Sequence, residues 1–181
     1  MNHRMGLLCF MLFATACGPE SEPATDETGK ALATAEPKAL AGPFDNTTLI
    51  SFWEGNNCSQ SQAGWTYYNY TAPMIIPNDG AVGWINDEAR SLKLEWWVPA
   101  GTIIRVYNSP SGSHDDDWAE ITILGGTDYL CIPSFQVPAN YPGNYTVRYC
   151  DMGGLDGKVS QVRAQPYAFN GDTCKGTWRT L

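Results

Sequence analysis

A strict alternation of apolar and polar residues is the feature that most restricts how this chain folds. In Leu92-Lys93-Leu94-Glu95-Trp96 the apolar side chains point to one side of an extended chain and the charged ones to the other. The segments 120–123 (Glu-Ile-Thr-Ile) and 145–149 (Tyr-Thr-Val-Arg-Tyr) repeat the pattern. A period of two with one polar face is typical of antiparallel strands that cover a core on one side.

Five further segments are strand candidates, and turn signals rich in Gly, Asn and Pro separate them. They are residues 49–53, 65–70, 102–107, 129–132 and 159–163. Because no run of ten or more residues carries a helical face, the sequence predicts an all-β fold, a β-sandwich.

Composition divides the chain into three parts. Residues 1–16 join a basic start to a short apolar run, which is typical of a signal peptide. Residues 17–43 contain no aromatic residue and mostly acidic charges, so we expect a disordered acidic linker. Residues 44–181 hold all seven tryptophans and all nine tyrosines and are expected to form the globular domain.

The end of the first part is similar to the lipobox of bacterial lipoproteins. Small residues at 14–16 run directly into Cys17, and the resemblance implies cleavage before Cys17 and its acylation. The alternative is ordinary signal cleavage beside an incidental cysteine. The lipobox implies a membrane partner through the lipid anchor, and Gly18 favours the outer membrane or cell surface as the location.

Net charge and cysteine count restrict partners and compartment. A net charge of −8 disfavours nucleic-acid binding through phosphate neutralisation. An even number of cysteines in an exported domain predicts two disulfides. Three pairings are possible, and we favour Cys131–Cys150, between neighbouring strands, with Cys58–Cys174, between the C-terminal tail and an early loop.

Two stretches resemble the signature that precedes the last strand of a βγ-crystallin Greek key. They are residues 86–94 (Asn-Asp-Glu-Ala-Arg-Ser-Leu-Lys-Leu) and 156–163 (Asp-Gly-Lys-Val-Ser-Gln-Val-Arg). The resemblance implies a two-motif Greek-key β-sandwich, with motifs over 48–98 and 101–165. The extra length relative to that family is assigned to loops such as 71–78 and 134–143.

The same resemblance implies a calcium site, since calcium-binding relatives use a hydroxyl at the fifth signature residue. The first copy has Arg90 there, which offers no lone pair, whereas the second has Ser160. Asp156, Asp87 and Glu54 are the expected carboxylate ligands. Weak calcium binding at Ser160 is one reading, and a purely turn-forming role of these polar residues is the other.

Other polar and aromatic groups give weaker indications. The acidic run 115–117 is expected to be a solvated loop rather than a metal site. With one histidine in the domain, His114, and no nucleophile elbow, we expect no enzyme. Adjacent Trp96 and Trp97 should face opposite ways, so one of them is available to a glycan or protein ligand, although tryptophan as core filler is the commoner case.

The sequence therefore predicts a non-enzymatic envelope lipoprotein with a βγ-crystallin-like binding or structural domain. One alternative is a peptidase inhibitor that uses residues 71–77, between two prolines, as its exposed loop. The other is a carbohydrate-binding surface module that uses Trp96 or Trp97.

Overall fold

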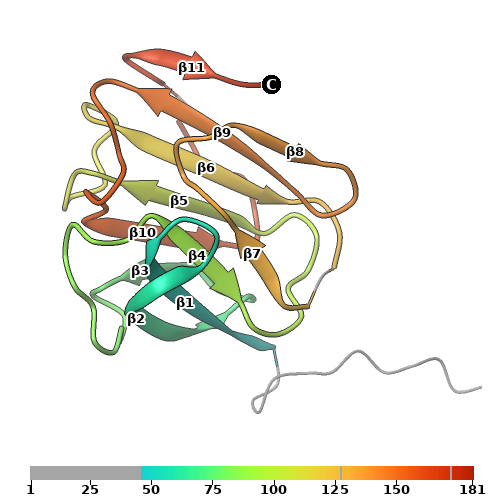
Figure 1. Cartoon of the computed structure of the whole chain (residues 1–181). Helices are drawn as coiled ribbons and strands as arrows, with labels where there is room; N and C mark the ends of the chain where they lie inside the picture. The colour runs from blue at the N-terminus through green and yellow to red at the C-terminus, as the bar shows by residue number, and fades with distance from the viewer. Residues whose placement is uncertain (1–45, 127, 172) are drawn as a thin grey trace, which may run out of the picture. The chain divides into compact units, whose positions relative to one another are not determined.

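The computed structural model describes residues 46–126, 128–171 and 173–181. The expected signal peptide (1–16), the acylated Cys17 and the linker (17–43) lie outside these residues. The all-β prediction is confirmed, since the described residues form two antiparallel sheets and no helix. The sheets face each other as a sandwich (Figure 1).

Eight strands correspond to the eight segments expected from the sequence. Their bounds are β1 (Thr47–Gly55), β2 (Ser59–Asn69), β4 (Ser91–Leu94), β5 (Ile103–Tyr107), β6 (Trp118–Ile123), β7 (Leu130–Ile132), β9 (Tyr145–Asp151) and β10 (Gln161–Gln165). Three short strands were not expected, namely β3 (Met74–Ile76), β8 (Ala139–Tyr141) and β11 (Thr177–Arg179).

Two of the unexpected strands lie in segments assigned above to loops. β3 lies within residues 71–78 and pairs with β10, while β8 lies within 134–143 and pairs with β9. The loop assignment is wrong for these two strands, because three-residue strands are too short to show a period of two. The third, β11, pairs with β9 at the edge of the sheet seen at the top of Figure 1.

The strand order interlocks the two halves of the domain. One sheet has the order β2-β1-β4-β7, so three strands of the first half accept β7 from the second. The other sheet has the order β11-β9-β6-β5-β10-β3, with β8 beside β9, so it accepts β3 from the first half. Each half thus gives one strand to the opposite sheet.

The core lies between the inward faces of the two sheets. The alternation along β4 and β6 places their aliphatic residues there, as expected, with Leu92, Leu94 and Ile121 fully buried. The largest core side chains include Phe52 and Tyr68. Burial of these apolar groups is the main stabilising contribution in a domain of this kind.

The outward face of the seven-stranded sheet carries a buried ion network. Arg105, Glu120 and Arg148 lie side by side on three neighbouring strands. One Glu120 oxygen lies 2.7 Å from Arg105 Nε and Nη2, and its other oxygen lies 2.9 Å from Arg148 Nε and 2.8 Å from Nη2. The C-terminal residues cover this row, with Phe169 over Arg105 and Trp178 over Arg148.

The four domain cysteines form two disulfides, as expected, but the favoured pairing is wrong. The observed bonds join Cys58 to Cys131 and Cys150 to Cys174. Strand exchange explains the first, since β7 lies beside β4 and brings Cys131 close to the β1–β2 turn. The second ties the C-terminal segment to β9. Two disulfides are typical of proteins in an oxidising, extracytoplasmic environment.

Candidate functional site

The two signature stretches form corners at corresponding positions of the two halves. We call residues 86–91 the first corner and residues 156–161 the second corner. The amide of Arg90 donates to the carbonyl of Trp53 at 2.9 Å, and the amide of Ser160 donates to the carbonyl of Tyr107 at 2.9 Å. Arg90 and Ser160 are therefore structurally equivalent, as the aligned signatures imply.

The two corners are in direct contact. Ser160 Oγ donates to Asp87 Oδ1 at 2.8 Å, and the Asp87 amide donates to the carbonyl of Val159 at 3.2 Å. Asp87 has a φ of 64°, a left-handed conformation that Asp tolerates better than most residues. These contacts join the hydroxyl of one half to the carboxylate of the other.

The guanidinium of Arg90 fills the first corner. Its Nη1 donates to the carbonyl of Glu54 at 2.6 Å. Gly157 of the second corner has a φ of 65°, and a Cβ added there would lie 2.5 Å from Arg90 Nη2. The left-handed backbone thus favours glycine at 157, and any larger residue there would also displace the guanidinium of Arg90.

Asp156 lies near Arg90. Burial raises the pKa of its carboxyl above the usual range, and the positive charge of Arg90 partly opposes that rise. Its Oδ1 is buried without a hydrogen-bond partner. The four expected calcium ligands are therefore divided: Asp87 meets Ser160, Asp156 lies beside Arg90, and the carbonyl of Glu54 accepts a hydrogen bond from Arg90.

The two corners differ in how well they suit a calcium ion. The first corner does not fit one, because a guanidinium already occupies it and binds the Glu54 carbonyl. At the second corner the Ser160 hydroxyl lies beside the carboxylate of Asp87, which the first corner contributes, and both are ligand types that calcium prefers. Among the described residues, no three Asp, Glu, His or Cys side chains gather in a metal-binding group.

Asp117 has a structural role that the sequence did not reveal. The expectation of a solvated loop is wrong at this residue, which is 1% exposed. Its Oδ1 accepts hydrogen bonds from Tyr149 Oη at 2.6 Å, the Met152 amide at 2.7 Å and the Gly153 amide at 3.1 Å. Burial alone would raise the pKa of Asp117, but these bonds and one from the Gly154 amide outweigh it and lower the pKa.

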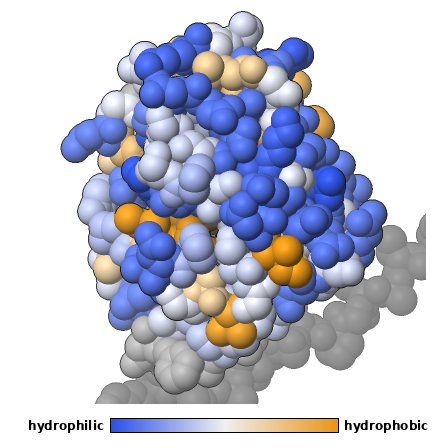
Figure 2. Space-filling view, turned by 90° about the vertical axis from the view of Figure 1, so that its left-hand side faces the viewer, coloured by the Kyte–Doolittle hydropathy of each residue, from blue (hydrophilic) through white to orange (hydrophobic). Residues whose placement is uncertain are grey.

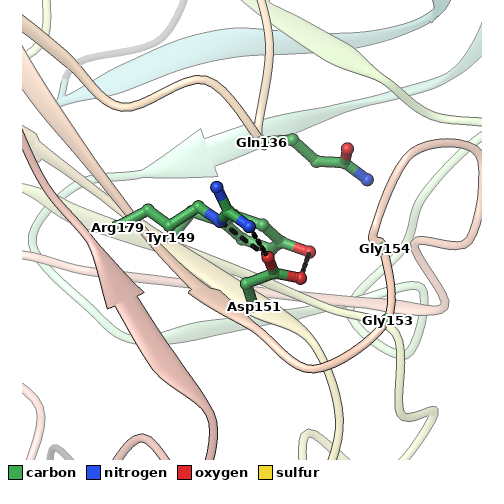
Figure 3. Close-up of a pocket in the computed structure, with 6 residues that line it drawn as sticks. All are labelled: Gln136, Tyr149, Asp151, Gly153, Gly154 and Arg179. Carbon is green, nitrogen blue, oxygen red and sulfur yellow. Dashed lines mark hydrogen bonds and ion pairs between the residues drawn. The ribbon is translucent and has the colours of Figure 1, made fainter.

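A polar pocket of about 390 Å³ lies beside this buried carboxylate, and Figure 3 shows its lining. Arg179 Nε donates to Asp151 Oδ2 at 2.6 Å, and the phenol of Tyr149 lies 3.2 Å from Asp151 Oδ1. Burial raises the pKa of Tyr149, and so do the nearby carboxylates of Asp117 and Asp151, which keeps the phenol protonated. The charged groups of this pocket thus satisfy one another.

Trp96 and Trp97, the two tryptophans named in the sequence analysis, and the tyrosines of β2 lie in different environments. Tyr68 is fully buried in the core. Trp96 stacks on Tyr67 with ring centroids 6.0 Å apart, whereas Trp97 packs edge-on against Tyr70 at 5.6 Å. Both tryptophans are partly exposed, and they contact different partners as expected of adjacent residues. The alternation predicted Trp96 on the same side as Leu92 and Leu94, which is wrong, because β4 ends at Leu94 and Trp96 packs on Tyr67 at the outward side of the sheet.

Three of the seven residues of the segment considered above as an inhibitory loop are held in the sheet. Met74–Ile76 forms β3 and pairs with β10, and Ile76 is fully buried.

The face seen in Figure 2 is mostly hydrophilic, with separate hydrophobic patches rather than one continuous apolar area.

The fold and corners together define a disulfide-linked all-β sandwich of two interlocked halves. Comparisons of the chain with protein-family models, curated proteins and solved structures found no match. None of the described residues belongs to a helix long and apolar enough to cross a membrane.

Proposed function

We propose that this chain is an exported, lipid-anchored envelope protein whose globular part is a non-enzymatic domain of the βγ-crystallin type. In this proposal the domain binds calcium weakly at the second corner and has a binding or structural role at the outer membrane or cell surface. The lipid anchor would be Cys17, for which the sequence alone provides the support.

The equivalent positions of the two signature copies support the family resemblance. The first signature copy leads into β4, which lies beside β1, and the second leads into β10, which lies beside β5. The two copies therefore have the same relation to the opening strand of their own half. Such internal similarity is expected if the halves are two copies of one Greek-key motif.

The contact between Ser160 and Asp87 is the observation that carries the calcium proposal. It places a hydroxyl and a carboxylate from opposite halves 2.8 Å apart, so a cation at this point would link the two halves. Calcium takes six to eight oxygen ligands, and these two side chains leave most positions to backbone carbonyls and water. We therefore expect affinity in the range of weak extracellular sites, about 10⁻⁴ to 10⁻³ M.

The Arg90 corner explains why one site rather than two is proposed. The guanidinium provides a fixed positive charge near Asp156 and binds the Glu54 carbonyl, so it occupies the place where a cation would otherwise be held. A permanently charged side chain needs no metal, so no calcium is expected at Arg90, whereas Asp87 of the same corner is a ligand of the proposed site at Ser160.

Thermal unfolding in calcium tests the proposal. If calcium binds only the folded state, a free calcium concentration of ten times the Kd raises the free energy of unfolding by about 1.4 kcal/mol, because the increase is RT ln(1 + [L]/Kd). The melting temperature of the purified protein should rise with calcium at millimolar concentration, and Ser160→Ala should abolish the rise. Thr146→Ala, which removes a hydroxyl from β9, is the matched control, because β6 and β5 separate β9 from β10 in the sheet. A calcium-independent melting temperature, or a rise that survives Ser160→Ala, would overturn the calcium proposal.

A further inference from the structure

The outward surface of the four-stranded sheet has an unusual composition. Outward positions of a water-exposed antiparallel sheet are normally polar. Here Trp65 and Tyr67 of β2 alternate with buried neighbours and point away from the core. Trp53 of β1 lies on the same side, since its indole binds Ser51, the partner of Trp65 in the sheet. Tyr67 is 41% exposed. We call this surface the aromatic face; it consists of Leu49, Ser51, Trp53, Trp65, Tyr67, Lys93, Glu95 and Trp96.

The rings of the aromatic face are ordered relative to one another. Tyr67 and Trp96 have nearly parallel planes, 7° apart, although they come from opposite sides of β1. Leu49 lies between them in the sheet, since it pairs with Tyr67 and its carbonyl accepts the Glu95 amide at 2.9 Å. Trp65 contacts the Tyr67 ring edge-on at 5.6 Å. Three rings of the face, Trp65, Tyr67 and Trp96, are therefore packed in a row.

A partly buried polar network fixes the centre of the face. Ser51 is 1% exposed, and its Oγ accepts a hydrogen bond from Trp53 Nε1 at 3.1 Å and donates one to Glu95 Oε1 at 3.4 Å. Lys93 Nζ lies 2.9 Å from the other oxygen of Glu95. The network holds the Trp53 indole in place, and fixed rings lose little entropy when a ligand binds.

Charge and size indicate the kind of ligand. Lys93 and Glu95 neutralise each other, so the face has no net charge to attract an ion. Their side chains remain 33% and 19% exposed, so a ligand's hydroxyl groups can reach them. The face comprises eight residues, whereas a standard protein interface uses about 20–30 residues on each side. A small neutral ligand with one flat apolar side and a polar rim fits these properties.

We propose that the aromatic face binds a neutral glycan of β-1,4-linked, gluco-configured pyranose rings. Equatorial hydroxyls leave C–H groups on the flat sides of such a ring, which pack against indole and phenol rings. The hydroxyls then project from the rim toward the carboxylate of Glu95 and the ammonium of Lys93. The proposal goes beyond the calcium-linked role and does not depend on it, since no residue of the aromatic face belongs to either corner.

Calorimetric titration of the purified protein with cellohexaose and with the hexamer of β-1,4-linked N-acetylglucosamine tests the proposal. Binding to one of them is expected, with little change between 50 and 500 mM NaCl because no net charge is involved. Removal of a stacked ring should weaken binding by about tenfold or more, so Tyr67→Ala and Trp96→Ala should each have this effect. Matched controls are Tyr141→Ala, an exposed tyrosine on the other sheet, and Trp97→Ala.

Several outcomes would overturn the glycan proposal. One is no heat of binding with either hexamer at millimolar concentration. Another is equal loss of binding in the Tyr141 and Tyr67 variants. A third is concentration-dependent self-association in sedimentation that Tyr67→Ala abolishes, which would make the aromatic face a contact between copies of this chain. The melting temperature of each variant is measured as well, so that loss of binding in a folded variant is distinguished from loss of folding. Calcium dependence of melting tests the second corner separately.

Discussion

Replacement of Glu120 by glutamine is predicted to destabilise the domain strongly. Glu120 is 6% exposed, and each of its carboxylate oxygens binds one guanidinium, that of Arg105 or that of Arg148. Glutamine keeps the shape but replaces one oxygen with an amide donor, which would face a guanidinium donor. It also leaves Arg105, which is 1% exposed, without the charge that compensates it.

The magnitude follows from the cost of an uncompensated buried charge. Removing one partner of a buried ion pair costs about 3–5 kcal/mol. For a domain of this size each kcal/mol shifts the melting temperature by roughly 4 °C, so we expect a decrease of about 12–20 °C. Packing of Phe169 and Trp178 over the arginines should keep salt from screening the effect.

Denaturant unfolding of Glu120→Gln and Glu95→Gln, at low and high salt, measures the difference. Glu95 is the matched control because it also binds a cation on the outward face of a sheet, but its pair with Lys93 is partly exposed. We expect Glu95→Gln to lower the free energy of unfolding by less than about 1 kcal/mol. If the two variants lose similar stability, the network around Glu120 is not an electrostatically important buried element and the reasoning fails.

Two further predictions concern other buried contacts. Asp117→Asn should cost about 2 kcal/mol at pH 7, because a carboxylate that accepts hydrogen bonds from Tyr149 and two backbone amides becomes a neutral amide. The folded pKa of Asp117 lies below its unfolded value, so its contribution is complete above the unfolded pKa and is lost as the pH falls through the folded pKa. Below about pH 4 the free energy of unfolding should therefore fall less steeply with falling pH in Asp117→Asn than in the unchanged protein. Equal pH dependence of the two proteins in this range would contradict the prediction. Removing the Cys58–Cys131 bond should lower the free energy of unfolding by about 4.5 kcal/mol, and removing Cys150–Cys174 by about 3.5 kcal/mol, because the bonds close loops of 73 and 24 residues. Denaturant unfolding of the two variants in which both cysteines of one bond are replaced by serine measures these losses. A larger loss for Cys150–Cys174 than for Cys58–Cys131 would contradict the prediction.

The sequence predicted the strands that show a period of two and missed those too short to show one. Leu92, Lys93 and Leu94 alternate clearly, and the structure places them as expected. Met74–Ile76 has three apolar residues in succession, so nothing in the sequence distinguishes an edge strand from a loop there. Such strands form only because the neighbouring strand, here β10, provides a hydrogen-bonding edge.

Long-range pairing explains the other differences. Cys131 was expected to bond Cys150 because both lie on strands close together in the sequence, but strand exchange takes β7 to the opposite sheet. At the corners, the sequence identified Arg90 and Ser160 as the differing residues. It did not show that Arg90 binds the Glu54 carbonyl or that Ser160 reaches Asp87, because those partners are 36 and 73 residues away.

Disulfide mapping tests most directly the central claim that the two halves exchange strands. Trypsin cleaves after Arg90, Arg105, Arg148, Lys158, Arg163 and Lys175, which leaves the four domain cysteines on four separate peptides. Mass spectrometry of the non-reduced digest should find the peptide that contains Cys58 linked to the one that contains Cys131, which lies on the exchanged strand β7. A link between the peptides of Cys131 and Cys150 would place β7 elsewhere and contradict the interlocked arrangement.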